Sequence, residues 1–483
     1  MTGSVNDMLK QLDDLVWGAP LMLLILSGGI YLTLRMKVLQ LVRLPLALKW
    51  TVKDEENGEG EVTSFGALCT ALSATIGTGN IVGVATAIGT GGPGALLWME
   101  LAAFFGMATK YAEGLLAVKY RVVGENHHVL GGPFYYIERG MGEKWKWMGK
   151  LFAFFGICVG LFGIGTFSQV NGISSAVNSY IDPDMEWLVQ IPFLGRTYSW
   201  TVVIASLVLT GCVAAVLIGG IQRIVHVAEF IVPFMAVIYL LITVALLVCN
   251  LDRIPEAVSV IVASAFRPQA ITGGVVGSMF VAMQKGVARG IFSNEAGLGS
   301  APIAAAAART REPVRQGLVS MTGTFIDTIL ICTMTGLSIV LTGAWKVEGL
   351  EGVAVTTCAF ERGLPIPGRV SAFLLMLCLV FFAFSTIIGW DYYSERCLEY
   401  LSGGKPGPLK VYRLLYIAAV FVGPYITVDM VWTMADIFNG LMAFPNMIAI
   451  FALRGVVVEE TEQFFRRYRK EQVSRTEVSS MEP

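Results

Sequence analysis

The sequence predicts an all-α, polytopic helical membrane protein with about 11 transmembrane helices, arranged as a 5+5 inverted repeat with two discontinuous helices. Of the 483 residues, 55% are hydrophobic and 15% charged, and the mean hydropathy is +0.65, whereas soluble proteins carry about 25% charged residues. The apolar runs are long enough for a hydrocarbon core roughly 30 Å thick, and they lack the alternation of a membrane barrel. A soluble enzyme, a secreted scaffold and a disordered protein are excluded, and the net charge of −1 leaves no basic surface for nucleic acid.

The hydrophobic segments follow one another with short polar connections. We do not expect the first to be a signal peptide, because Asp13 and Asp14 precede it where a signal carries positive charge. We expect segments at roughly 17–36, 63–91, 94–120, 147–178, 199–219, 224–250, 270–308, 315–343, 367–401, 409–424 and 428–453.

Basic residues predict the orientation in the cell inner (plasma) membrane. One set of loops, together with the tail 454–483, holds 25 Lys and Arg, and the N-terminus with the opposite loops holds seven. We therefore expect the N-terminus outside and the tail in the cytoplasm.

Two segments contain residues that disfavour a continuous helix. Segment 63–91 reads Ser73-Ala-Thr-Ile-Gly-Thr-Gly-Asn80 across its middle, and such Gly, Thr and Asn residues favour turns and caps. Segment 270–308 would be about 58 Å long as one helix at 1.5 Å per residue, and it contains Asn294-Glu-Ala-Gly-Leu-Gly-Ser-Ala-Pro302. Close helix packing is the alternative reading of the glycines, and we adopt it for Gly160, Gly163 and Gly165.

The two breaks lie five segments apart, in segments of opposite direction. This is the plan of inverted-repeat secondary transporters, which hold substrate where both discontinuous helices open. We expect one transmembrane transporter domain over 1–483, with a first repeat at 63–250, a second at 270–453, and 17–36 as an extra helix.

Three stretches resemble the alanine or glycine:cation symporter family. They are Ala74–Ile81 with Gly91-Gly-Pro-Gly94, Gly131-Gly-Pro-Phe-Tyr-Tyr-Ile137, and Gly290-Ile-Phe-Ser-Asn-Glu-Ala-Gly-Leu-Gly-Ser-Ala-Pro302. The resemblance covers nearly the whole chain from the second segment onward. It implies a leucine-transporter-type fold and sodium-driven uptake of small neutral amino acids, with proton use in some members.

An amino-acid zwitterion needs donors for its carboxylate and acceptors for its ammonium. The helix that begins after the first break offers the N–H groups of Thr78, Gly79 and Asn80, and the carbonyl of Thr75 would face the ammonium. The family resemblance makes Gln169 a substrate contact, and a helix–helix hydrogen bond is the alternative.

The segment 367–401 supplies hydroxyls and a large wall residue. Ser385 and Thr386 suit a sodium ion, and similar transporters complete that site with carbonyls that here belong to Ser73 and Ile76; bonding back to their own helix is the alternative. Thr386 and Trp390 share a helix face. We expect Trp390, together with Phe167, to bound the substrate pocket.

Charged residues inside apolar segments are costly unless paired. Lys110 and Glu113 are predicted to satisfy each other. Lys285, Arg289, Asn294 and Glu295 are predicted to cluster at the second break, as a gate or as a scaffold for the unwound backbone. Asp327, Asp391, Asp429 and Asp436 receive no role.

The function predicted from these features is a secondary active symporter that couples inward sodium movement to uptake of alanine or glycine by alternating access. Sodium is preferred because no buried carboxylate is evident at the first break to carry a proton. Proton coupling and, less favoured, a channel are the alternatives, and an intramembrane enzyme lacks its motifs. The expected partners are a small amino acid and lipid, with no cofactor, nucleic acid or obligate protein partner.

Overall fold

The structure is a computed structural model that describes residues 2–53, 55, 58–124, 128–191, 196–266, 279–426 and 428–479. Helices dominate it, and two antiparallel hairpins are its strands: β1 (Val122–Val123) with β2 (Val129–Leu130), and β3 (Leu188–Ile191) with β4 (Arg196–Ser199). The all-α fold class is confirmed. Each of the eleven predicted segments contains helix, and three of them are interrupted within the residues described.

The first half of the chain, including the first predicted repeat, contains thirteen α-helices over the described residues. They are α1 (Thr2–Val16), α2 (Ala19–Arg35), α3 (Leu39–Val42), α4 (Leu44–Val52), α5 (Ser64–Thr75), α6 (Val82–Gly91), α7 (Gly94–Lys119), α8 (Pro133–Tyr135), α9 (Lys146–Phe162), α10 (Phe167–Ile181), α11 (Trp200–Leu217), α12 (Gly220–Val248) and α13 (Ile254–Phe266). A short 3-10 turn, η1 (Thr78–Asn80), separates α5 from α6.

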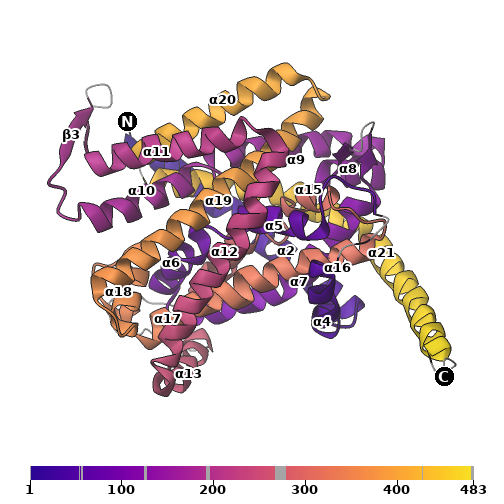
Figure 1. The fold of residues 1–483 in the computed structure, drawn as a ribbon, viewed down its shortest axis with the longest axis horizontal. Helices are drawn as coiled ribbons and strands as arrows, with labels where there is room; N and C mark the ends of the chain where they lie inside the picture. The colour runs from indigo at the N-terminus through magenta and orange to yellow at the C-terminus, as the bar shows by residue number, and fades with distance from the viewer. Residues whose placement is uncertain are drawn as a thin grey trace.

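The second half of the chain also contains one broken helix followed by longer helices. Its elements are α14 (Met279–Asn294), α15 (Ala301–Ala306), α16 (Pro313–Thr324), the π-helix η6 (Phe325–Cys332), α17 (Thr333–Leu341), α18 (Val353–Gly363), α19 (Gly368–Ser402), α20 (Pro406–Val422) and α21 (Val428–Ser479). In Figure 1, α18 and β3 lie on the left of the molecule, and α8, α15 and the end of α21 lie on the right.

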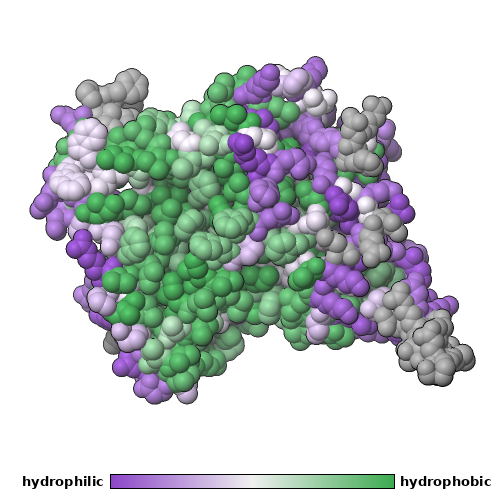
Figure 2. Space-filling model, viewed as in Figure 1, coloured by the Kyte–Doolittle hydropathy of each residue, from purple (hydrophilic) through white to green (hydrophobic). Residues whose placement is uncertain are grey.

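The surface and the burial of the helices agree with a membrane protein. Seven helical stretches of the described residues are long and apolar enough to cross a membrane: Gly94–Lys119, Glu143–Ile181, Trp200–Leu217, Gly220–Val248, Pro313–Leu341, Gly368–Ser402 and Thr433–Glu471. Figure 2 shows a broad hydrophobic face with hydrophilic side chains gathered toward its ends. The most apolar stretch of α7 is 83% buried, against 28% for α11 and 33% for α12, so α7 is central and α11 and α12 present their sides to lipid.

Three features of the helices differ from the sequence prediction. The segment 147–178 is interrupted, because α9 ends at Phe162 and α10 begins at Phe167. The packing role assigned to Gly163 and Gly165 was therefore incomplete: Gly163 ends α9 with φ −110° and ψ −136°, outside the helical region. The last helix continues past residue 453 to Ser479, so the described part of the tail 454–483 is helical. The start of segment 270–308 lies outside the described residues.

Candidate functional site

The first break is where the sequence places it. The helix α5 ends at Thr75 and α6 begins at Val82. Between them, the side-chain oxygen of Asn80 accepts a hydrogen bond from the N–H of Gly77 at 2.9 Å. This side-chain bond gives the unwound backbone a partner that a continuous helix would have supplied.

Thr78, predicted to bind the substrate carboxylate, contacts Gln169, which the family resemblance implies as a substrate contact. Gln169, near the start of α10, accepts a hydrogen bond from the N–H of Thr78 at 3.0 Å through its amide oxygen. An amide oxygen at this N–H has the acceptor chemistry of a carboxylate oxygen. A Cβ on Gly77 would lie 2.9 Å from that amide oxygen and 2.5 Å from the hydroxyl oxygen of Thr386, so the break closely approaches α10 and α19.

Of the four residues predicted to bind sodium, Thr386 contacts the first break, whereas the hydroxyl of Ser385 faces the sulfur of Met235 in α12. Thr386 donates to the carbonyl of Ile76 at 3.1 Å, and a Cβ on Gly389 would lie 2.6 Å from the hydroxyl oxygen of Ser73. Ser385 and Thr386 also bond back to the carbonyl of Phe382, at 2.8 and 3.1 Å. The predicted ligands are fully buried, and their uncharged oxygens have the chemistry that a hard monovalent cation prefers.

The second break is also confirmed. The helix α14 ends at Asn294, and the connection to α15 has positive φ at Glu295 (57°), Gly297 (90°) and Gly299 (83°). The left-handed conformation is costly for a residue with a side chain. It is held at Glu295 because this carboxylate accepts hydrogen bonds from the indole of Trp390, at 2.9 Å, and from the hydroxyl of Ser300.

The predicted cluster of Lys285, Arg289 and Glu295 is wrong. Lys285 is exposed, and Arg289 forms an ion pair at 2.9 Å with Asp436 of α21. Glu295 is fully buried and belongs to the break. Six residues turn an α-helix by about 240°, so Arg289 and Glu295 leave α14 in different directions. Asn294 acts as scaffold: its side chain bonds the N–H of Ala296 and the hydroxyl of Thr328, at 2.9 and 3.0 Å.

Asp327 joins the two breaks, which the sequence analysis missed. Its carboxylate accepts hydrogen bonds from Asn80 of the first break at 2.8 Å and from Ser293 of α14 at 2.9 Å. The expectation that no buried carboxylate lies at the first break was therefore wrong. The signal available in the sequence was an isolated Asp in the otherwise apolar segment 315–343, which marks a functional position by default.

The predicted pair of Lys110 and Glu113 is not formed in the described structure. Glu113 accepts a hydrogen bond at 2.7 Å from Asn446, which also donates to the carbonyl of Gly297 at 2.8 Å. The ammonium of Lys110 has no hydrogen-bond partner among the described residues. The spacing of the two residues on α7 allows a pair. The carboxylate of Glu113 is bonded instead to Asn446, which also contacts the second break.

The predicted wall residues lie beside the interruption between α9 and α10. Trp390 is 1% exposed, and a Cβ on Gly165 would lie 2.7 Å from the Cβ of Trp390. Phe167 begins α10 and packs its ring 5.8 Å from that of Phe162. The side chain of Trp390 therefore leaves no room for a Cβ at Gly165. The indole N–H of Trp390 donates its hydrogen bond to Glu295.

The side chain of Arg121 joins one end of the first broken helix to one end of the second. Arg121 donates to the carbonyls of Glu59, Ala306, Ala308 and Thr310, at 2.6 to 2.8 Å. The segment before α5 and the segment after α15 are thereby held together. An ion pair at 2.7 Å between Glu61 and Arg396 fastens the same region to α19.

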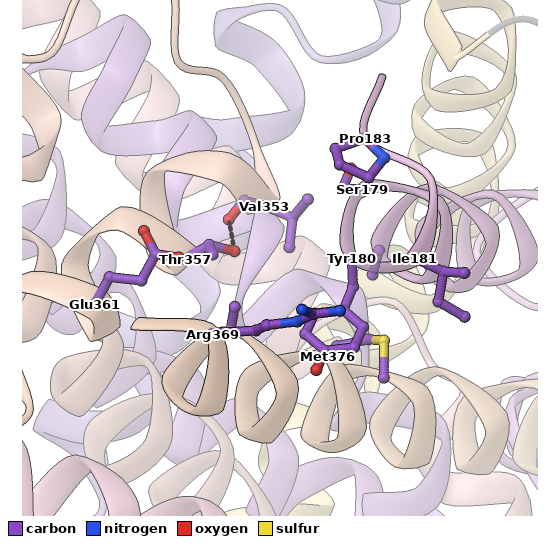
Figure 3. Close-up of a pocket in the computed structure, with 11 residues that line it drawn as sticks. Ser179, Tyr180, Ile181, Pro183, Val353, Thr357, Glu361, Arg369 and Met376 are labelled. Carbon is purple, nitrogen blue, oxygen red and sulfur yellow. Dashed lines mark hydrogen bonds between the residues drawn. The ribbon is translucent and has the colours of Figure 1, made fainter. Parts of the chain in front are cut away.

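Two cavities lie among the helices at a distance from this closure. A cavity of about 540 Å³ is lined by α6, α10, Arg289 and the start of α18, and it includes Ser168 and Asn171 next to Gln169. A second, of about 450 Å³, contains none of the predicted site residues. Figure 3 shows it between α10 and α18, with Arg369 extending toward Tyr180.

Comparisons with known proteins agree with this architecture. A family model described as the sodium:alanine symporter family matches residues 2–478. An uncharacterized transporter of Haemophilus influenzae is 50% identical over 476 residues, covering 98% of this chain and 99% of that protein. The sodium/alanine symporter AgcS of Methanococcus maripaludis is 45% identical over 466 residues, covering 95% of this chain and 96% of AgcS.

A solved structure supports the fold independently. The crystal structure of MhsT in complex with L-phenylalanine aligns with a TM-score of 0.50 at 13% identity, covering 83% of this chain and 99% of MhsT. This likeness bears on the fold alone and confirms the leucine-transporter-type architecture. The chain therefore belongs to the sodium:alanine symporter family, and it is a membrane transporter rather than an enzyme.

Proposed function

We propose that this amino acid–cation symporter couples inward sodium movement to the uptake of alanine and glycine. The observation that carries the proposal is the contact at 3.1 Å between the Thr386 hydroxyl and the Ile76 carbonyl. It joins α19 to the first break with two uncharged oxygens, and a sodium ion coordinated by Ser385, Thr386 and the carbonyls of Ser73 and Ile76 would replace that bond. The name of AgcS, a sodium/alanine symporter, supports the same ion and substrate.

The substrate site would be shared with the same break. The carboxylate of the amino acid takes the N–H groups of Thr78, Gly79 and Asn80, and it displaces the amide oxygen of Gln169 from Thr78. Gln169 is then free to bind the substrate itself. Because sodium and the carboxylate would bind at one short unwound segment, each would stabilise the backbone geometry that the other needs, which is the basis of coupling.

The surroundings of Gly77 support a small substrate. Gln169 and Thr386 both lie within 3 Å of where a Cβ on Gly77 would be, so the space beside the break is narrow. Trp390 and Phe167 are proposed as its walls, and the hydrogen bond of Trp390 to Glu295 fixes one wall in place.

Access to the site would alternate between its two ends. The 540 Å³ cavity opens beside α6 and α10, whereas the region around Arg121 is closed by hydrogen bonds. With the orientation given by the basic residues, N-terminus outside and C-terminus in the cytoplasm of the inner membrane, the cavity faces outward. The repeats 63–250 and 270–453 would exchange these roles, and the pair Arg289–Asp436 is proposed as the outer gate.

Proton coupling is the second candidate, and Asp327 is the observation that favours it. Its carboxylate contacts the first break through Asn80, where a proton could neutralise it during the cycle. In this case sodium would be dispensable for uptake.

Uptake of labelled alanine into proteoliposomes separates these functions. We expect an inward sodium gradient to drive accumulation at equal pH on both sides. Full accumulation driven by a pH gradient in sodium-free buffer would instead support the proton-coupled carrier. Counterflow adds a control against a channel: vesicles preloaded with unlabelled alanine accumulate label only if the protein is a carrier.

A further inference from the structure

A cavity at the end of α2 gathers basic side chains. It has a volume of about 490 Å³ and is lined by the end of α2, by α3 and by the part of α21 that begins at Val458. This volume is typical of small-ligand sites, which measure about 300–1,000 Å³. One lining residue, Glu462, carries a carboxylate. Five are cationic: Arg35, Lys37, Arg43, Arg466 and Arg469.

The protein itself supplies little negative charge to these cations. Arg466 pairs with Glu462 at 3.1 Å. Within the described part of the chain, no ion pair is formed by Arg35, Lys37 or Arg469. Positive charges gathered in one cavity repel each other. An anion from outside the protein would therefore stabilise the arrangement.

Aromatic packing holds the two sides of the cavity together without using these charges as pairs. Trp50 of α4 packs edge-on against Phe464 and Tyr468 of α21, with ring centroids 5.9 and 5.7 Å apart. Arg43, between α3 and α4, places its guanidinium carbon 4.3 Å from the ring centroid of Phe465. In Figure 1, α4 and the end of α21 both lie at the lower right. The basic residues of α2 and α3 are thus positioned beside those of α21 by packing.

Exposed apolar side chains adjoin the same cavity. Leu34, Leu41 and Val42 are 70%, 58% and 63% exposed, and Val42 also lines the cavity. The segment 17–36 is the expected extra transmembrane helix, and α2 ends at Arg35, so this region lies where the chain leaves the hydrocarbon core. Basic clusters at this level of a membrane protein attract anionic headgroups. A soluble anion would fill only the charged part and would leave the apolar side chains in water.

We propose that this cavity binds the headgroup of an anionic phospholipid. The phosphate lies among the five cations, and the acyl chains run along Leu34, Leu41 and Val42. Arginine suits this role, because its guanidinium offers paired donors to phosphate oxygens. The lipid joins the extra helix α2 to α21 and anchors both at the membrane surface. The inference is independent of the coupling ion and of the amino acid that is carried.

The test uses the purified full-length protein in micelles of a neutral detergent. The melting temperature is recorded at increasing mole fractions of phosphatidylglycerol, and we expect it to rise. Phosphatidylcholine, whose headgroup has no net charge, should leave it unchanged, and so should inorganic phosphate. An equal rise with phosphatidylcholine overturns the proposal, and an equal rise with inorganic phosphate shows a site for a soluble anion and overturns the assignment to lipid.

Two substitutions made together test whether the cavity is the site. Arg35→Gln with Arg469→Gln removes two cations that form no ion pair in the described structure. A basic residue near an anionic surface contributes about fivefold to affinity, so the mole fraction that gives half of the rise should increase about 25-fold. Lys405→Gln with Lys410→Gln is the matched control, since it removes two exposed positive charges outside the cavity. It should leave the half-maximal mole fraction unchanged.

A third variant changes the charge in the opposite direction. Glu462→Gln removes the one carboxylate that lines the cavity and should lower the half-maximal mole fraction about fivefold. A double variant that responds to phosphatidylglycerol like the parent overturns the proposal. If the double variant does not fold, Glu462→Gln decides by itself, and an unchanged or higher half-maximal mole fraction in it overturns the proposal.

Discussion

Replacing Gly77 by alanine tests whether the first break is the shared site of sodium and substrate. The added Cβ would lie 2.5 Å from the Thr386 hydroxyl oxygen and 2.9 Å from the Gln169 amide oxygen. Ordinary van der Waals contact begins near 3.4 Å, so the two side chains must withdraw by about 0.9 and 0.5 Å. Gly77 itself has φ −144°, which any residue adopts, so the effect comes from the lost space and not from backbone strain.

The expected magnitude follows from that displacement. Inserting a methyl group into a packed site costs about 1–3 kcal/mol, which corresponds to a loss of roughly 5- to 150-fold in affinity. The bonds of Thr386 to Ile76 and of Thr78 to Gln169 are the ones that would break, so both sodium and alanine should bind more weakly. The global fold should persist, because the helices α5 and α6 are already separated at this point.

The assay is binding of labelled alanine to the purified protein at several sodium concentrations, with the melting temperature recorded for each variant. Gly211→Ala is the matched control, since a Cβ at this position of α11 meets nothing within 4 Å. Alanine and sodium affinities equal to those of the parent in Gly77→Ala would refute the placement of both sites at the break.

Three further substitutions test neighbouring parts of the site. Gln169→Ala should weaken alanine binding while the melting temperature stays normal, and a variant that fails to fold would identify a structural hydrogen bond instead. Trp390→Leu should let unlabelled leucine compete with labelled alanine, with a stability loss of about 1–3 kcal/mol because Glu295 loses a donor; equal leucine inhibition in parent and variant would exclude Trp390 from the pocket. Arg289→Gln should raise the rate of alanine exchange by weakening the pair with Asp436, and unchanged exchange would argue against this pair as a gate.

The two breaks could be predicted from the sequence because their cause is local. Gly77 and Asn80 in one segment, and Asn294 and Gly297 in the other, disfavour a helix by their own conformational preferences. The third interruption, between Gly163 and Thr166, contains one such polar residue, Thr166, and no Asn. Its glycines fit helix packing equally well, so the sequence offered no ground for choosing between the two readings.

The partners of the charged residues could not be predicted, because they depend on which helices meet. Arg289 pairs with Asp436, 147 positions away in the chain, and Asp327 reaches Asn80 across 247 positions. The spacing along α7 suggested the pair Lys110–Glu113. This prediction was wrong, because the carboxylate of Glu113 bonds to Asn446 of α21 instead. Sequence periodicity reports on neighbours within a helix and is silent on contacts between helices.

The four hydrogen bonds of Arg121 have a consequence for the kinetics of opening. A single guanidinium bridges the chain before α5 and the chain after α15. The backbone of Val62 also pairs directly with Ala307 and Arg309, so all these bonds must break before the two segments separate. A guanidinium that bonds four carbonyls holds them in one geometry, so loosening one segment weakens the contact to the other. The joined ends of the two broken helices should therefore separate in one concerted step, so that a half-open state leaking the ion without the amino acid is scarcely populated.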